Sequence, residues 1–309
     1  MGQALSSQEI AGRLRYRRSR HLRERFIEAL LFSAALVAVA TTVGIVFILL
    51  KESLAFFREV SIVSFFTDSQ WTPLFSDPHF GIWVLLSGTL TSSAIALCVA
   101  IPVGTILAIY LSEFASARTR EIAKPVLELL AGIPTIVFGY FALFFVTPLL
   151  KQFIPGLPGF NLLSAGLVMG VMIVPYISSI SEDAMRAVPM ALREGAYAMG
   201  ATRLQVALTV VVPAAFSGLA AAYILGISRA VGETMIVAVA AGMQPNLTFN
   251  PMDQAATITA YIVQVAKGDL PHGSVGYQTI FAAGLTLFVL TLCFNLLGYW
   301  LRRRYREEY

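Results

Sequence analysis

Two oppositely charged residues stand in an otherwise apolar stretch of the chain, GISRAVGETMIVAVAAG at 226–242. Arg229 and Glu233 are four residues apart, so a continuous helix would place them on one face and let them pair. An arginine within a membrane span costs at least about 2.5 kcal/mol, so it normally faces protein or a water-filled path. Its guanidinium matches tetrahedral oxyanions such as phosphate through paired N–H donors.

Chemistry alone leaves two interpretations of this pair open. In the functional one, Arg229 attracts an anion, while Glu233 holds the arginine in place or repels the anion so that it leaves. In the structural one, the two form a salt bridge that locks this span to a neighbour. Ser228, Thr234 and Thr89 are weaker candidates for the path, because hydroxyl groups in spans often bond only to their own helix backbone.

The second pattern is a polar segment between two apolar spans, EGAYAMGATRLQVALTVVVP at 194–213. Gly200 can take a positive φ at no steric cost, so a short helix can end there and a second can leave at an angle. We predict a helix–turn–helix that docks into another protein. The alternative is an ordinary amphipathic connector.

The composition indicates whether these elements fold in water or in a membrane. Hydrophobic residues make up 57% of the 309 residues and charged residues 13%, with a mean hydropathy of +0.74. A soluble protein carries about 25% charged residues, so we predict an all-α, polytopic membrane protein. The stretches near or above the roughly 20 apolar residues that a crossing needs are 29–50, 83–111, 126–149, 160–181, 208–242 and 279–301.

Arginine positions predict the topology of these six transmembrane helices. Arginines cluster before the first span and after the last, so both the N and C termini are predicted to be cytoplasmic, and the 194–213 segment falls on the same side. The basic arm favours anionic lipid headgroups over nucleic acid. The predicted division is a basic arm at 1–28, a first transmembrane helix at 29–50, an external aromatic loop at 51–82, a core at 83–301 with a cytoplasmic loop at about 183–207, and a basic tail at 302–309.

Several classes of chemistry are excluded by what the sequence omits. No Gly-Lys dipeptide occurs, so no P-loop is present and the chain cannot energise transport by itself. His21, His79 and His272 all fall outside the spans, which argues against a metal site in the membrane. Cys98 and Cys293 fit small buried hydrophobes. We expect no enzyme activity, no metal and no cofactor of its own.

Local signals refine the core. Gly132 and Pro134 in the third span, and Pro175 in the fourth, predict kinks, which either line a central path or are structural without a function. The 208–242 stretch is too long for one crossing, so it starts in the cytoplasm or breaks near Gly232. Lys124 and Glu128 are spaced for a helical ion pair.

The two external segments also carry structure signals. Trp71 with Pro73, in the 51–82 segment, suggests an ordered loop or short helices at the membrane interface. In the last external segment, Asn250-Pro251 reads as the entry of a short helix that ends at Gly268.

The 194–213 segment resembles the "EAA" signature of permease subunits in prokaryotic ABC importers, which reads E-A-A, three residues, G, nine residues, I-x-L-P. The departures are Gly195 for the first Ala, and Val for Ile and Leu. In that family the loop is a coupling helix seated in a groove of a cytoplasmic ATPase. The resemblance implies the type I importer permease fold. It assigns ATPase coupling to Glu194, Gly195, Ala196, Gly200, Val212 and Pro213.

Four strings narrow the resemblance to phosphate ABC-transporter permeases. The 226–242 string is similar to the family's G-x-x-R-A-x-G-E-T, and the others are SGTLTSS (87–93), ELLAGIPTIVFG (128–139) and MIVPYISSISEDAMRAVP (172–189). The basic arm and the W-x-P loop are more similar to the permease called PstC than to its partner PstA. The resemblance implies that Arg229 and Glu233 serve phosphate passage.

This resemblance also implies an assembly in a prokaryotic cytoplasmic (inner) membrane. A second, PstA-like permease would complete the path, a PstB-like ATPase dimer would use ATP and Mg, and a periplasmic or surface PstS-like protein would deliver inorganic phosphate. Three alternatives stay open: a permease for another oxyanion (molybdate, sulfate or phosphonate), an ion-coupled secondary transporter, and a regulatory membrane subunit with the permease fold.

Overall fold

The computed structural model describes residues 7–73, 75–268, 271 and 273–304, without the side chains of 7–20, 22 and 302. The predictions for the end of the tail, for His272 and for most arginines of the basic arm lie outside these described parts. The chain divides into two compact units, Met1–Glu52 and Ser53–Tyr309, and each is described by itself.

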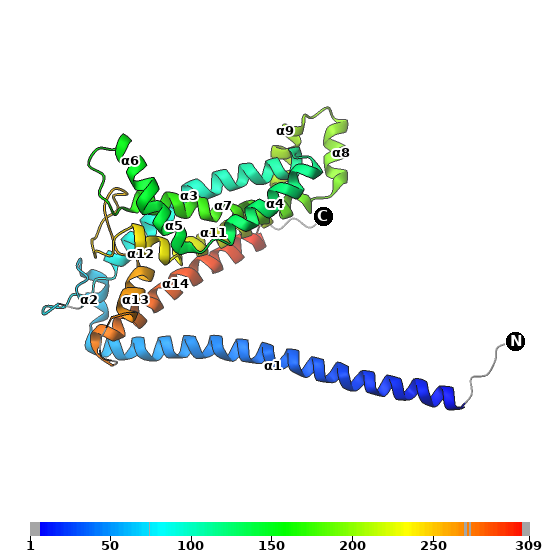
Figure 1. Cartoon of the computed structure of the whole chain (residues 1–309), viewed down its shortest axis with the longest axis horizontal. Helices are drawn as coiled ribbons and strands as arrows, with labels where there is room; N and C mark the ends of the chain where they lie inside the picture. The colour runs from blue at the N-terminus through cyan, green and yellow to red at the C-terminus, as the bar shows by residue number, and fades with distance from the viewer. Residues whose placement is uncertain (1–6, 74, 269–270, 272, 305–309) are drawn as a thin grey trace. The chain divides into compact units, whose positions relative to one another are not determined.

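The first unit consists of helix α1, which runs over Ser7–Glu59 and so extends into the second unit (Figure 1). Its candidate membrane span is Arg23–Glu59, with a mean hydropathy of 2.5 over the most apolar stretch. The predicted span at 29–50 lies inside it. Residues 51–59, predicted as external loop, continue the helix.

The second unit contains the remaining elements. In chain order they are α2 (Ile62–Thr67), α3 (Trp83–Ile109), the π-helix η1 (Tyr110–Phe114), α4 (Ala117–Ala131), α5 (Thr135–Phe141), π-helix η2 (Ala142–Val146), α6 (Thr147–Phe153), α7 (Leu162–Arg186), α8 (Met190–Ala198), α9 (Arg203–Val206), π-helix η3 (Ala207–Val211), α10 (Val212–Ala214), α11 (Phe216–Val231), α12 (Met235–Ala240), α13 (Ile258–Ala266) and α14 (Val275–Arg304). The described residues form helices, with one isolated bridge between Trp71 and Phe80.

Five described helices are long and apolar enough to cross a membrane, or six if the bent pair Arg203–Ala214 and Phe216–Val231 is one span. This confirms the prediction of an all-helical polytopic membrane protein. The 208–242 stretch is not one continuous helix, as its length predicted: that pair is bent by 74° and α11 ends at Val231. The break expected near Gly232 is confirmed.

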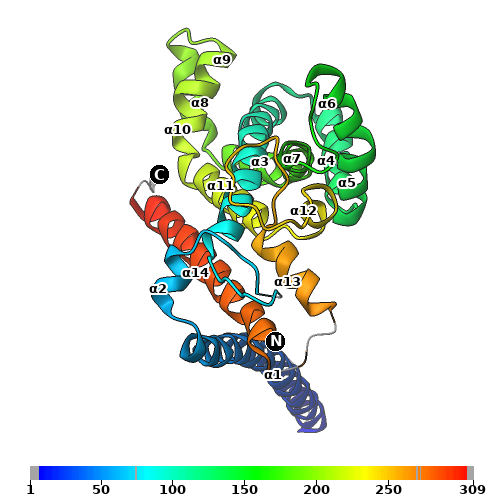
Figure 2. The same ribbon diagram turned by 90° about the vertical axis from the view of Figure 1, so that its left-hand side faces the viewer.

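Helix α7 lies at the centre of the second unit, surrounded by α3, α4, α5, α11 and α12 (Figure 2). Of its most apolar stretch, 61% is buried inside the protein, against 28% for α3. Its contact with α3 is close because Gly166 and Gly170 carry no Cβ: an added Cβ at Gly170 would lie 2.8 Å from the carbonyl oxygen of Ala96. This small-xxx-small spacing lets two membrane helices approach.

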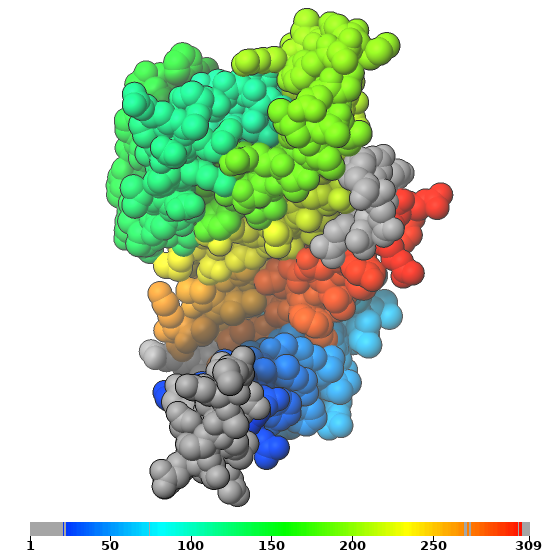
Figure 3. All heavy atoms as spheres, turned by 90° about the vertical axis from the view of Figure 1, so that its right-hand side faces the viewer, coloured from blue at the N-terminus to red at the C-terminus, as the bar shows by residue number. Residues whose placement is uncertain are grey.

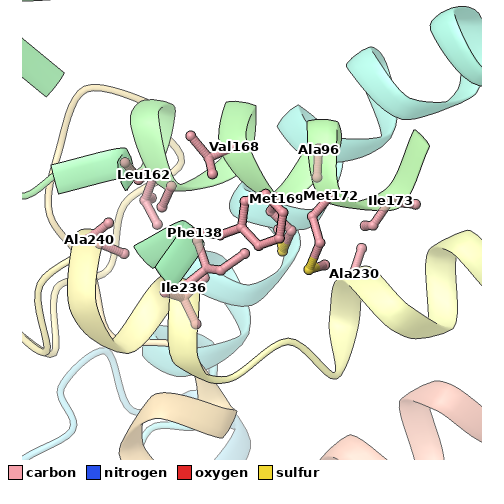
Figure 4. Packing of buried hydrophobic residues seen from close by; sticks show 14 of the residues in the cluster. Ala96, Phe138, Leu162, Val168, Met169, Met172, Ile173, Ala230, Ile236 and Ala240 are labelled. Carbon is pink, nitrogen blue, oxygen red and sulfur yellow. The ribbon is translucent and has the colours of Figure 1, made fainter. Parts of the chain in front are cut away.

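The main apolar core forms around α7. Phe138 from α5, Met169 and Met172 from α7, and Ile236 from α12 meet there (Figure 4). Helices α5 and α12 reach this core as short pieces, because the predicted spans at 126–149 and 208–242 are both interrupted. Helix α4 ends at Ala131 and α5 begins at Thr135, so the Gly132–Pro134 signal marks a break between helices rather than a kink within one.

A second core orders the segments predicted to be external, including residues 51–82. The Trp71 indole is 1% exposed and packs edge-on against Tyr261 of α13, with 5.1 Å between ring centroids. Phe56 and Phe65 add further edge-on contacts. The predicted helix entry at Asn250-Pro251 is wrong, because α13 begins at Ile258. Its N-cap is Thr257, whose side chain accepts a hydrogen bond from the amide of Ala260.

The helix start moves because the preceding polar side chains bond to one another. Asn250 donates to the Asp253 carboxylate over 3.0 Å, and Thr248 donates to the same group over 2.7 Å. The amide of Met252 also donates to the Asn250 side chain over 3.2 Å. Such a bond gives the backbone an alternative to the hydrogen bonds of a first helical turn. The helix ends at Ala266, close to the predicted end at Gly268.

The Asp68–His79 pair in the 51–82 segment predicts a pH dependence. His79 Nδ1 lies 2.7 Å from Asp68 Oδ2, and this hydrogen bond raises the pKa of His79 above its ordinary 6.5. Partial burial raises the pKa of Asp68, but the hydrogen bond and charge of His79, together with the backbone amides of Gln70 and Ser69, lower it to below the ordinary 3.8. The segment should therefore be most stable between these two ordinary values. Its stability should fall as pH rises through the raised pKa of His79, and also as pH falls through the lowered pKa of Asp68.

The pH dependence of the segment's stability is measured by hydrogen exchange of the amides of Gly81 and Ile82, corrected for intrinsic rates. Both amides are hydrogen-bonded within the segment. His79→Gln should remove the loss of protection on the alkaline side. A wild-type profile that stays flat from pH 5 to pH 9 would contradict the role of the pair.

Candidate functional site

Arg229 lies in the last turn of α11, beside an interruption of the helix. Gly232 is the C-cap of α11, and Thr234 is the N-cap of α12. Because the helix has ended before Glu233, the four-residue spacing no longer places Arg229 and Glu233 on one helix face. The predicted Arg229–Glu233 ion pair is wrong, and no salt bridge joins these two described residues.

Glu233 instead stabilises the start of α12. Its Oε1 accepts hydrogen bonds from the amides of Met235 over 3.0 Å and Ile236 over 3.4 Å. The side chain is buried, with 8% exposure, and a carboxylate at a helix N-terminus is favoured by the free N–H groups there. Thr259 of α13 also donates to the Glu233 carbonyl oxygen over 2.6 Å. Glu233 therefore fixes the shape of the interruption.

Arg229 finds an aromatic partner in place of a carboxylate. Its Cζ lies 4.3 Å from the ring centroid of Tyr176 on α7, a cation–π contact worth about 0.5–2 kcal/mol. The Arg229 Nε is buried and has no hydrogen-bond partner among the described residues. Tyr176 in turn donates to the carbonyl oxygen of Ala131 over 3.4 Å. The contact thus joins the ends of α11 and α4 across the middle of α7.

The three hydroxyl candidates differ in how they are used. Ser228, next to the arginine, donates to Asn295 of α14 over 3.5 Å, and Thr234 donates to the carbonyl of Gly232 over 3.3 Å. Thr89 is 2% exposed. It donates to the carbonyl of Leu85 over 2.8 Å and accepts from the amide of Ile258 over 3.0 Å. Thr89 therefore holds the start of α13 against α3.

The predicted helix–turn–helix forms at the end of the second unit where α3 and α7 finish (Figure 1). Gly200 has a φ of +86° and separates α8 from α9. A capping box starts α9: the Thr202 hydroxyl accepts from the Gln205 amide over 3.4 Å, and the Gln205 side chain accepts from the Thr202 amide over 2.8 Å. The turn expected at Gly200 is confirmed.

The signature residues of this loop divide between surface and core. Glu194, Gly195 and Gly200 are exposed, whereas Ala196 packs onto the core formed around Val206 and Met185. Val212 is half-buried in the same core, and Pro213 is exposed within the short helix α10. The loop also exposes large apolar side chains, namely Met190, Leu192, Tyr197, Met199 and Leu204.

Arg193, directly before the signature glutamate, anchors this loop to the bundle. Its Nη2 donates to the Met185 carbonyl over 2.8 Å and to Glu113 Oε1 over 3.2 Å, and its Nη1 donates to the Val188 carbonyl. Both charged side chains are buried, at 10% and 6% exposure. Helix α8 is therefore tied to η1 and to the end of α7. Sequence spacing gave no signal for this pair, because the partners are distant in the chain.

A second charge cluster joins α4 to α7. The Glu182 side chain is fully buried, and its Oε2 lies 2.6 Å from Lys124 Nζ. Arg120 and Arg186 approach Oε1 at 3.4 and 3.5 Å. Lys124 also donates to Asp183 over 2.7 Å.

These contacts overturn the predicted Lys124–Glu128 ion pair, because Lys124 faces two carboxylates of α7 while Glu128 is exposed. Burial lowers the pKa of Lys124, but hydrogen bonds and charges from Asp183 and Glu182 outweigh that and raise it above its ordinary 10.5. In the sequence, the only hint of this cluster is the S-x-D-A string at 181–184, which contains Glu182 and Asp183.

Comparison with known proteins shows the family to which the chain belongs. The chain matches the family described as "Binding-protein-dependent transport system inner membrane component" over residues 100–307. The chain belongs to this family. It is a permease, the non-catalytic multi-pass inner-membrane component of an ABC importer that works with ATPase and binding-protein partners.

Named relatives lie close to the permease in sequence. It is 37% identical over 290 residues to "Probable ABC transporter permease protein YqgH" of Bacillus subtilis (strain 168), covering 93% of this chain and 94% of the relative. It is 33% identical over 249 residues to "Phosphate transport system permease protein PstC" of Xylella fastidiosa (strain 9a5c), covering 74% and 75%. It is 34% identical over 278 residues to "Phosphate transport system permease protein PstC 1" of Mycobacterium tuberculosis, covering 78% of this chain and 81% of the relative.

Solved structures support the fold. A chain of the bacterial alginate ABC transporter superposes with a TM-score of 0.63 at 19% identity, covering 90% of the permease and 95% of that chain. The inward-facing MetNI methionine ABC transporter gives 0.54 at 21% identity, covering 74% and 95%. The importer permease fold predicted from the sequence is confirmed.

The anchor at Arg193 predicts a large stability effect. Arg193→Met leaves the buried Glu113 carboxylate without its cation, and breaking such a pair costs about 3–5 kcal/mol. Chemical unfolding of the purified permease in detergent, followed by circular dichroism, measures the loss. Adding Glu113→Gln to the variant should recover part of it.

Arg118→Met is the matched control, because Arg118 is exposed on α4 and an exposed charge contributes about 0–1 kcal/mol. Equal losses for Arg193→Met and Arg118→Met would show that the buried pair does not anchor the loop.

Proposed function

We propose that the permease conducts inorganic phosphate, with Arg229 as the residue that binds it in the path. The observation that carries this proposal is the state of the Arg229 guanidinium. It stacks on Tyr176 and has a buried Nε without a hydrogen-bond acceptor among the described residues. An unsatisfied buried donor is costly, and an arriving oxyanion would supply the acceptor through charge-assisted hydrogen bonds.

The position of Arg229 supports this role. A free charge within an apolar bundle normally faces protein or a water-filled cavity, and backbone leaves helical geometry in a membrane only at such places. Two such interruptions, at Gly232 and at Gly132–Pro134, are joined through Tyr176. Glu233 then acts by holding the α11–α12 interruption open for the arginine.

The named relatives agree with phosphate as the cargo. The PstC proteins are phosphate transport permeases by name, at 33–34% identity. The YqgH name carries no substrate. Another oxyanion, such as sulfate, molybdate or phosphonate, is the second candidate, because a guanidinium offers the same paired donors to each of them.

We further propose that α8 is the coupling helix. Its exposed apolar side chains, and that of the C-cap Met199 at 88% exposure, suit insertion into a groove of a PstB-like ATPase. A second, PstA-like permease would complete the path, and a PstS-like protein would deliver phosphate on the side of Trp71. Both termini would then lie in the cytoplasm. Movement of α8 would reach the bundle through Arg193 and its bonds to η1 and α7.

Arg229→Gln should lower ATP-driven phosphate uptake by roughly 10–100-fold, because the variant loses charged hydrogen bonds worth about 1.5–3 kcal/mol. Radiolabelled phosphate uptake is measured in vesicles that contain the permease, its ATPase, its partner permease and the binding protein, with and without ATP. Arg118→Gln makes the same charge change at an exposed site and should leave uptake unchanged. Normal uptake by Arg229→Gln in an intact assembly would contradict the proposal.

Gly200→Val should uncouple ATP hydrolysis from transport. A β-branched residue at a positive φ costs about 1–2 kcal/mol, which shifts the turn equilibrium by roughly 5–30-fold. An added Cβ meets nothing within 4 Å, so the effect comes from the backbone alone. The phosphate-to-ATP ratio in the same vesicles measures the coupling.

Two controls separate backbone strain from a general effect of substitution in the loop. Gly200→Asn tolerates the left-handed conformation, and Gly195→Ala lies in the same loop at a glycine without positive φ and with open space around it. Both should keep the ratio near that of the wild type. Coupling unchanged in Gly200→Val would argue against α8 as the coupling element.

A further inference from the structure

A cavity of about 820 Å³ lies beside the loop that carries α8 and α9. Its wall is formed by η1, the start of α4, the end of α7, and residues of α8 and α9. Figure 3 shows this region of the second unit, with the α8–α9 segment in yellow-green next to the end of α3 and the start of α4. Arg229 is not part of this wall, so the cavity is separate from the proposed phosphate path.

Four arginines from three parts of the fold line the cavity: Arg120 of α4, Arg186 of α7, and Arg193 and Arg203 of the α8–α9 segment. Their donors are only partly used. Arg120 makes its hydrogen bond through Nε, to the carbonyl of Leu111. Arg203 is exposed and has no hydrogen bond or ion pair with any described residue.

Arg186 is similarly available. Its side chain is 50% exposed and meets Glu182 only at 3.5 Å, from Nη1. A guanidinium has five N–H donors, so Arg120, Arg186 and Arg203 together keep many donors free for a ligand.

The negative charge near the cavity is already neutralised. Glu113 is the carboxylate among the described residues of the wall. It accepts hydrogen bonds from Ser112 over 2.8 Å and from Arg193 over 3.2 Å. Glu182, behind Arg120 and Arg186, is held closely by Lys124 at 2.6 Å. The wall therefore carries an excess of positive charge.

The α4 helix adds a favourable dipole. Ser116 lies in the wall and is the N-cap of this 15-residue helix. Free backbone N–H groups and the positive end of the helix dipole favour an anion at such a terminus. The free guanidinium groups and the helix terminus thus act in the same direction.

We propose that this cavity is a second oxyanion site that binds a phosphate group and bridges the α8–α9 segment to α4 and α7. An anion held between Arg203 on one side and Arg120 and Arg186 on the other would restrain α8. Accumulated phosphate would then slow further transport. That regulatory consequence rests on the proposed coupling role of α8, whereas the binding itself does not.

Binding is tested on the full permease with Arg229→Gln, purified in detergent, so that the proposed path does not contribute. Isothermal titration with inorganic phosphate is the first arm, and short-chain phosphatidylglycerol without phosphate is the second. Free phosphate as the source gives saturable binding in the first arm, and a lipid headgroup gives it in the second. Arg203→Gln and Arg186→Gln should each weaken the affinity about ten-fold. Arg118→Gln, on α4 but outside the wall, should leave it unchanged.

Both cavity variants alter exposed side chains, so folding should be kept, and circular dichroism checks this. Absence of binding in both arms would overturn the site, even if phosphate uptake by the wild type is normal. Equal affinities for Arg203→Gln and Arg118→Gln would overturn it as well. If the cavity variants instead lose the ATPase subunit during co-purification without a change in phosphate binding, the cavity receives an acidic side chain of that subunit and the proposal is wrong.

Discussion

The close contact between α3 and α7 is the constraint on which the other features depend. Gly166 and Gly170 let the two backbones approach, and the contact makes α7 the central helix. Three residues of α7 make the key contacts. The Tyr176 ring packs against Arg229, Glu182 pairs with Lys124 of α4, and the Met185 carbonyl accepts a hydrogen bond from Arg193. One helix therefore connects the proposed anion path with the proposed coupling loop. Such rigid packed elements can transmit a displacement over a distance.

Arg193 and Arg229 show how environment separates structural charges from functional ones. Arg193 is almost fully satisfied by two carbonyls and the Glu113 carboxylate. Arg229 has an aromatic ring beside it and keeps an unpartnered Nε. A buried charge that lacks an acceptor is costly, and such a state suits a residue whose partner arrives and leaves. The difference is invisible in the sequence, where Arg229 has a carboxylate four residues away and Arg193 has none at that spacing.

Two predicted ion pairs failed for related physical reasons. Arg229–Glu233 assumed a continuous helix, but α11 ends between them and Glu233 caps α12. Lys124–Glu128 assumed a helix facing water, but packing against α7 offers Lys124 two closer carboxylates. Helical spacing shows which groups can meet when no tertiary partner competes. It could not reveal the Lys124–Glu182 and Arg193–Glu113 pairs or the arginine-lined cavity, because their members come from distant segments.

The sequence by itself determined the all-helical membrane class, the order within the 51–82 segment, the turn at Gly200 and the interruption at Gly232. Each follows from local composition or from the conformational freedom of glycine. Only the tertiary structure decided which charges pair and which donors stay free. It also moved the start of α13 and divided the 126–149 span. Those outcomes depend on burial and on contacts between segments far apart in the chain, and a one-dimensional pattern does not contain these quantities.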